Sequence, residues 1–142
     1  MLPNNGKAWI LKNETPGLVI VQITRAEIMD DRTVRLFSAL WDDLLSHVGD
    51  GGVVVLNFRD VALFSSSFLG SLFRAHRKFE QRGVRFVACH LSKSLQEVFY
   101  VAGSKQPLEY MLNYSDTEEL AAAKARRMVK GGHHGPASND LA

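Results

Sequence analysis

The chain has 142 residues, of which 46% are hydrophobic and 23% are charged, and its formal net charge is +2. These values are typical of one globular domain, and they exclude disorder along the whole chain and a nucleic-acid binder with a large basic surface. The single cysteine, Cys89, excludes an intramolecular disulfide and a zinc site built from several cysteines.

Two strands are predicted first, over residues 8–11 and 18–23, with Thr15-Pro16-Gly17 as the hairpin turn between them. A polar loop is expected over residues 25–32. A helix should follow over residues 33–47, because apolar residues recur there at steps of three and four.

The middle of the chain predicts a strand, a junction and a second helix. Residues 53–58 form an apolar, β-branched run typical of a buried strand, and a second apolar step covers residues 61–64. Three serines come next, and a helical pattern runs over residues 67–81. A further buried strand is expected over residues 84–89.

The last third predicts two more helices. Ser92 is a candidate N-cap for a helix that Gly103 would end, and residues 107–112 could form an edge strand. Ser115 and Glu118 have capping-box spacing, which predicts a final helix to about Met128. We therefore expect one domain over residues 1–128.

Residues 129–142 are Gly-rich and polar, which predicts a flexible C-terminal tail. The pair His133-His134 in such a tail would be a poor metal site, so no metal is expected. No run of about 18 apolar residues is present, and the N-terminus is too polar for a secretory signal. The sequence thus predicts a cytoplasmic protein without a membrane span.

A hairpin followed by alternating strands and helices predicts an α/β fold. The sheet should be small and mixed, parallel through its crossovers and antiparallel at its start, with helices packed mainly on one face.

The serines at the strand-to-helix junction allow two interpretations. A hydroxyl there can cap the helix, which is worth about 1 kcal/mol. It can also carry a phosphate, because the free amides and the dipole at a helix N-terminus favour a negative group. Capping by one serine does not exclude a switch at another.

The order of elements and four segments resemble the STAS domain, the fold of bacterial anti-sigma-factor antagonists and of the cytoplasmic end of sulfate transporters. The resemblance covers about residues 8–123. The segments are VIVQITRAEIMDDRT, VVVLNFRDVALFSSSFLG, HRKFEQRGVRFVACHLSKSLQEVFYVAG and YSDTEELA.

The resemblance implies a phosphorylation site. The family pattern Asp-Ser-Ser-Gly-Leu-Gly falls on residues 65–70, which places Ser67 on the serine that the partner kinase phosphorylates and Ser66 on the serine before it. Two positions depart from the pattern. Ser65 replaces the family aspartate, and Phe68 replaces the family glycine.

The resemblance also implies a partner-binding surface formed by the loop and helix start at residues 64–70 and by the loop before the first helix. The partner would be an anti-sigma factor with serine-kinase activity, and the resemblance leaves homo-oligomer formation open. Phe68 could face outward into the interface or turn into the core. The predicted partner-binding residues are Asp30 with its neighbour Asp31, Asn57, Phe64, Ser65, Ser66, Ser67, Phe68 and Gly70.

The sequence also bears on other functional classes. No phosphate loop, dinucleotide fingerprint, nucleophile elbow or His-Glu-x-x-His motif is present, so we expect neither an enzyme nor a cofactor. A receiver domain is disfavoured because the third strand ends in Asn57 rather than in an aspartate. An unswitched scaffold of a larger signalling assembly and a small-ligand sensor stay open as alternatives. The cations of residues 74–85 form either a solvated face or a surface for an acidic partner.

Overall fold

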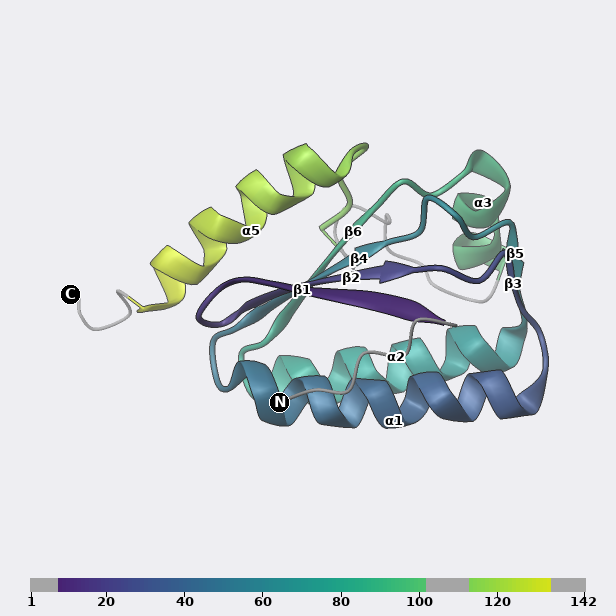
Figure 1. Ribbon diagram of the computed structural model, residues 1–142, viewed down its shortest axis with the longest axis horizontal. Helices are drawn as coiled ribbons and strands as arrows, with labels where there is room; N and C mark the ends of the chain where they lie inside the picture. The colour runs from purple at the N-terminus through teal and green to yellow at the C-terminus, as the bar shows by residue number, and fades with distance from the viewer. Residues whose placement is uncertain (1–7, 102–112, 134–142) are drawn as a thin grey trace.

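The computed structural model describes residues 8–101 and 113–133, and the α/β fold is confirmed (Figure 1). The strands are β1 (Trp9–Thr15), β2 (Leu18–Ile23), β3 (Glu27–Ile28), β4 (Val53–Asn57), β5 (Leu63–Phe64) and β6 (Arg85–Cys89). The helices are α1 (Asp31–Val48), α2 (Ser66–Gln81), α3 (Lys93–Val101) and α5 (Glu118–His133).

The main sheet has four strands in the order β1-β2-β4-β6. β1 and β2 are antiparallel and meet at a tight turn, where Gly17 has a φ of 83° that only glycine adopts easily. β2, β4 and β6 are parallel, joined by crossovers that contain α1 and α2. The predicted mixed sheet is therefore confirmed, including its antiparallel start.

The helices cover both faces of this sheet. α1 and α2 pack side by side on one face, where most of the buried residues form a single aromatic and aliphatic core (Figure 1). α5 crosses the opposite face, where its alanines and Val129 meet the β-branched side chains of β2, β4 and β6. The prediction of helices mainly on one face holds for α1 and α2, and α5 adds a thinner second layer.

A two-stranded ladder at the end of the molecule was not foreseen. β3 lies within the predicted polar loop, and it pairs in parallel with β5, with Ile28 opposite Phe64. Because α1 begins three residues after β3 and α2 begins two residues after β5, the ladder holds the starts of both helices together (Figure 1).

The start of α5 corrects the predicted cap. Thr117, not Ser115, is the cap, because its Oγ1 accepts from the amide of Leu120. Ser115 instead joins the edge of β6, where its amide donates to the carbonyl of Ala88. Glu118 turns toward the sheet rather than back to the cap.

The end of α5 also differs from the prediction. The helix continues past Met128 to His133, and Val129, one residue beyond the predicted end, still packs against the sheet. Residues 129–133, which were expected to belong to the tail, are therefore helical. The predicted stop at Gly103, the edge strand over residues 107–112 and the tail from residue 134 lie outside the described residues.

Candidate functional site at the paired helix starts

The first turns of α1 and α2 lie beside each other at one end of the molecule (Figure 1). The amide of Ser65 donates to the carbonyl of Ile28 at 2.9 Å, so the residue that starts α2 is bound to the strand that leads into α1. This end therefore presents two helix N-termini, each with amides that lack an intrahelical acceptor. Such a place favours negative groups and is accessible to a partner.

The three serines have different environments. Ser65 is the N-cap of α2, and its Oγ accepts from the amide of Phe68 at 3.1 Å. Ser66 and Ser67 are the first two helical residues, and both are exposed. The capping interpretation is therefore correct for Ser65, and it leaves the hydroxyls of Ser66 and Ser67 at the surface.

Phe68 turns into the core and is fully buried. Its ring packs edge-on against Phe37 at 5.4 Å between centroids and lies near Trp41 at 6.3 Å and Phe64 at 5.2 Å. The aromatic side chain at the family's glycine position therefore adds no bulk to the surface. It fastens the first turn of α2 to α1 from below.

Asp30 caps α1 as Ser65 caps α2. Its Oδ2 accepts from the amide of Thr33 at 3.0 Å and its Oδ1 from the Thr33 hydroxyl at 2.7 Å. The hydroxyl contact, followed by the amide contact, lowers the pKa of this exposed carboxyl below its ordinary value. Asp31 lies next to it in the first turn of α1 and is also exposed. The structure thus gives Asp30 the capping position and brings both acids to the same end as the serines.

Three of the residues predicted to bind a partner lie beneath the surface instead. Phe64 and Phe68 belong to the aromatic core, and Asn57 is 3% exposed. The side-chain amide of Asn57 is already paired within the fold: Nδ2 donates to Glu118 Oε1 at 2.8 Å, and Oδ1 accepts from the amide of Arg59. These side chains support the surface, whereas Asp30, Asp31, Ser66 and Ser67 form it and Gly70 is half-buried in α2.

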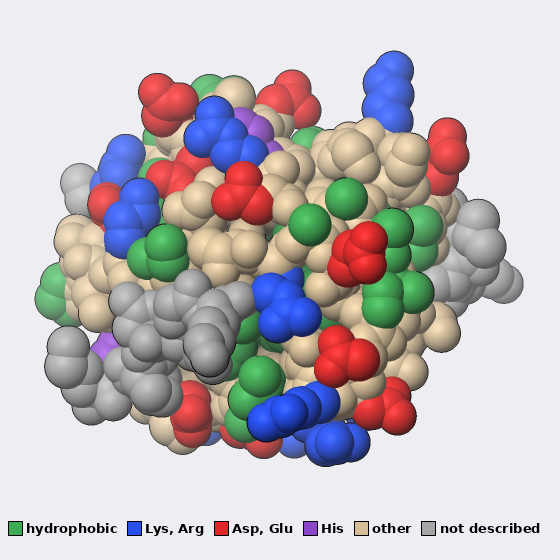
Figure 2. Space-filling model, turned by 45° about the vertical axis from the view of Figure 1, so that its right-hand side comes forward, with side chains coloured by type: hydrophobic (Ala, Val, Ile, Leu, Met, Phe, Trp, Pro, Cys, Tyr) green, Lys and Arg blue, Asp and Glu red, His purple; other side chains and the backbone are tan. Residues whose placement is uncertain are grey.

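Two apolar residues at this end were missed by the sequence interpretation. Met29 is 50% exposed just before α1, and Leu63 is 39% exposed in β5. Exposed apolar side chains beside a polar loop are typical of protein-binding surfaces. The end that carries the two helix starts comes forward in Figure 2, where hydrophobic side chains lie among both acidic and basic ones. Met29 and Leu63 are exposed because they lie in or next to the β3–β5 ladder at the end of the molecule. The ladder strands are too short to give a periodic pattern, so the sequence does not predict this exposure.

Within residues 8–101 and 113–133, no three His, Cys, Asp or Glu side chains gather in a way that could hold a metal ion. Burial raises the pKa of the Cys89 thiol to about 12, so it is not a ready nucleophile at neutral pH. None of the described helices is both long enough and apolar enough to cross a bilayer.

Comparison with known proteins gives one family and a consistent set of folds. The family model for the STAS domain matches residues 10–120. No curated protein matches this chain.

Three solved structures illustrate the shared fold. Bacillus SpoIIAA, an anti-sigma-factor antagonist in its unphosphorylated form, is 20% identical, with a TM-score of 0.62 over 84% of this chain and 98% of that one. A STAS-domain protein from Planctomyces limnophilus is 14% identical, with a TM-score of 0.67 over 82% and 96%. A variant of RsbS from Moorella thermoacetica is 15% identical, with a TM-score of 0.68 over 86% and 97%. SpoIIAA has also been solved in a phosphorylated form, and this too has the fold.

Proposed function

This chain belongs to the STAS-domain family, and we propose that it acts as a regulatory protein-binding module whose partner is an anti-sigma factor with serine-kinase activity. The module binds its partner through the surface formed by Asp30, Asp31, Ser66, Ser67 and Gly70 and has no catalytic role of its own. Phosphorylation of Ser67, with Ser66 as the second candidate, releases the partner.

The observation that carries this proposal is that one serine caps α2 while the next two serines are exposed. Ser65 alone supplies the cap, so Ser66 and Ser67 can be modified without removing the hydrogen bond that starts α2. Had Ser67 been the cap, modification would have changed the hydroxyl oxygen that accepts the first hydrogen bond of the helix. The substitution of Ser65 for the family aspartate also has a simple explanation, because both residue types cap helices well.

A phosphate on Ser67 would change the surface far more than the fold. It adds about −1.5 to −2 charges at neutral pH, and the free amides and dipole of the first turn of α2 can accommodate them. The packing of Phe68 beneath this turn holds the helix start in place. A partner that contacts the turn meets new charge and bulk beside the exposed carboxylates of Asp30 and Asp31. Association is therefore controlled by local electrostatics.

Mass spectrometry of the protein from its native cell tests the proposal. Trypsin releases residues 60–74, a peptide that contains Ser65, Ser66, Ser67 and Ser71. We expect one phosphate on this peptide, at Ser67 or Ser66, and its loss in the Ser67→Ala, Ser66→Ala double variant. Ser71 is buried and serves as the internal control. An unmodified peptide, both in growing cells and after incubation with ATP and native extract, contradicts the switch and favours an unswitched scaffold.

A further inference from the structure

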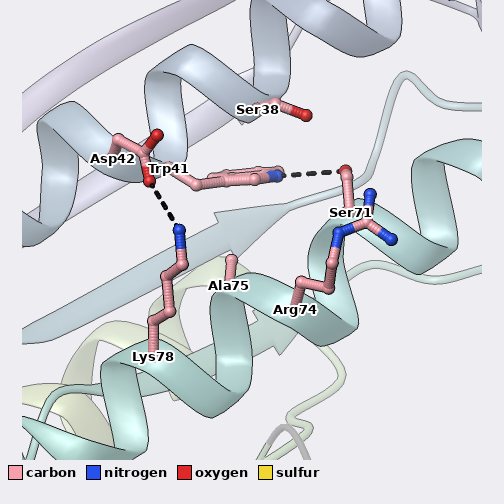
Figure 3. A pocket seen from close by; sticks show the side chains of 7 residues that line it. All are labelled: Ser38, Trp41, Asp42, Ser71, Arg74, Ala75 and Lys78. Atoms are coloured by element: carbon pink, nitrogen blue, oxygen red, sulfur yellow. Dashed lines mark hydrogen bonds and ion pairs between the residues drawn. The ribbon is translucent and has the colours of Figure 1, made fainter.

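The outer side of the α1–α2 pair carries a shallow groove of about 100 Å³ (Figure 3). Trp41 forms its floor, and the walls come from both helices. The lining side chains are Ser38, Trp41, Asp42, Ser71, Arg74, Ala75 and Lys78. The groove lies apart from the paired helix starts but shares α2 with them.

The polar groups of the groove are arranged in a chain from its floor. The indole Nε1 of Trp41 donates to Ser71 Oγ at 3.3 Å, and that hydroxyl donates to the carbonyl of Phe68 at 2.8 Å. Ser71 is 3% exposed, so its position is fixed. At one end Lys78 and Asp42 form a solvent-exposed ion pair at 3.5 Å across the groove, so each of these two charges has a partner of opposite sign.

Arg74 is the cation of the groove whose charge is not balanced. Among the described residues, no acidic side chain forms an ion pair with it, whereas Lys78 and Arg82 of the same stretch each have one. Its guanidinium reaches back along α2 over Gly70, where Nη1 lies 3.4 Å from the position of an added Cβ. Figure 3 shows the group turned into the groove, toward Ser71 and Ser38. The groove is therefore short of one negative charge.

We infer that this groove receives a carboxylate side chain from an acidic segment of a protein partner. One unpaired guanidinium matches one carboxylate in charge and in the planar geometry of its donors. A dianionic group fits less well, because, within the part of the chain that the structure describes, Arg74 is the only cation of the lining that is not already paired with an acidic side chain. The groove is also too shallow to enclose a free small molecule, so we expect the carboxylate to be carried by a longer acidic segment that lies along the groove.

Continuity along α2 connects this groove to the proposed binding surface. Ser67, Gly70 and Arg74 follow one another at steps of three and four, so they lie on one side of the helix. A partner that covers the first turn of α2 can therefore also reach Arg74. In this respect the inference rests on the proposed function, and it adds a second, charge-specific contact to it.

Nuclear magnetic resonance of the indole N–H groups tests the inference without the partner. The chain has two tryptophans, so Trp9→Phe assigns the remaining indole signal to Trp41. The probe is an acetylated, amidated hexaglutamate peptide, and hexaglutamine, hexalysine and inorganic phosphate are the comparison ligands. We expect a saturable shift of the Trp41 signal with hexaglutamate alone.

Two variants separate a site from diffuse attraction. Arg74→Gln should weaken hexaglutamate binding by about tenfold, as expected for the loss of a charge-assisted hydrogen bond. Arg77→Gln removes the same charge from an exposed neighbour that does not line the groove, and should change the affinity by less than about twofold. Equal loss in both variants, no saturable shift, or an equal response to phosphate would each overturn the inference. The peptide measurement does not depend on Ser67, so its failure and the absence of phosphate from residues 60–74 are separate results.

Discussion

The residues at the start of α2, which appear in the sequence as one serine cluster followed by Phe68, have different structural roles. Ser65 caps, Ser66 and Ser67 stay free, and Phe68 anchors the turn in the core. The sequence placed the cluster correctly at a helix start. It could not assign the cap, because capping depends on the first helical residue, and the helix begins at Ser66 rather than at Ser67.

The cap gives the first testable difference. Ser65→Ala removes the acceptor for the amide of Phe68 and should lower the free energy of unfolding by about 1 kcal/mol. Ser66→Ala is the matched control, since Ser66 is exposed and should change stability by less than about 0.5 kcal/mol. Urea unfolding of both variants measures the difference. A loss at Ser66 equal to the loss at Ser65 would show that the cap is misassigned.

Gly70 gives a second testable prediction, on both stability and binding. Its φ is not positive, and an added Cβ would meet only the flexible end of Arg74. Glycine inside a helix is less stable than alanine by about 0.5–1 kcal/mol, so Gly70→Ala should raise the free energy of unfolding by that amount. Nothing in the described residues requires glycine here, and the proposed binding surface predicts that the missing side chain lets a partner approach closely. Gly70→Ala should therefore be more stable in urea and bind the partner less well. A destabilised variant would argue against this explanation.

At the scale of elements, the β3–β5 ladder and the docking of α5 decide how the site is built. The long elements, α1, α2, β2 and β4, follow from periodic apolar residues, and the sequence predicted them to within two residues at each end. β3 and β5 have two residues each, too few for any periodicity, and they form only because the chain brings them together. The structural role of Asn57 also depends on a contact that only the folded chain creates, because its hydrogen-bond partner Glu118 is 61 positions away.

The contacts of Glu118 predict a dependence of stability on pH. Burial alone would raise the pKa of this carboxyl, but donation from Asn57 at 2.8 Å and from Lys12 at 3.0 Å outweighs it and lowers the pKa below 4.5. A lowered folded-state pKa means that the stabilisation is complete above the unfolded value and is lost as pH falls through the folded value. The wild-type protein should therefore lose stability below about pH 4.5.

The matched variants for this effect are Glu118→Gln and Glu119→Gln. Glu118→Gln should unfold with a weaker dependence on pH in the acid range than the wild-type protein. Glu119→Gln changes an exposed neighbour and should keep the wild-type slope. Thermal unfolding followed by circular dichroism in buffers from about pH 6 to pH 3 makes the comparison. If the wild-type protein and Glu118→Gln showed the same dependence of unfolding temperature on pH, the Glu118 contacts with Asn57 and Lys12 would not be stabilising α5 on the sheet.

Across the whole molecule, the sheet separates a large core beneath α1 and α2 from a thin one beneath α5. Leu72 lies fully buried in the large core, on the face of α2 that packs against the sheet and α1. Leu72→Ala should lower the free energy of unfolding by about 2–5 kcal/mol, as expected for a large-to-small change in a packed core. A change under about 0.5 kcal/mol in urea unfolding would show that this face is not packed in solution.

The fold was predictable at this scale because its pattern of strands and helices extends over most of the chain. The site was predictable only in position, since burial separates its surface residues from those that support them. Asn57, Phe64 and Phe68 were predicted to bind a partner but are buried. Met29 and Leu63 were not predicted to bind a partner, yet their side chains are exposed at the same end. Periodicity assigns faces within long elements, whereas these residues belong to short ladders, loops and helix ends.

Affinity capture from the native cell tests the central claim most directly. Immobilised wild-type protein and Ser67→Asp are compared side by side, with Ser67→Ala as the control for loss of the hydroxyl and with thermal unfolding measured for all three. The account predicts that the wild-type protein and Ser67→Ala retain an ATP-binding, kinase-like protein, that Ser67→Asp retains several-fold less, and that all three unfold at nearly the same temperature. Equal retention by Ser67→Asp and the wild-type protein would contradict it.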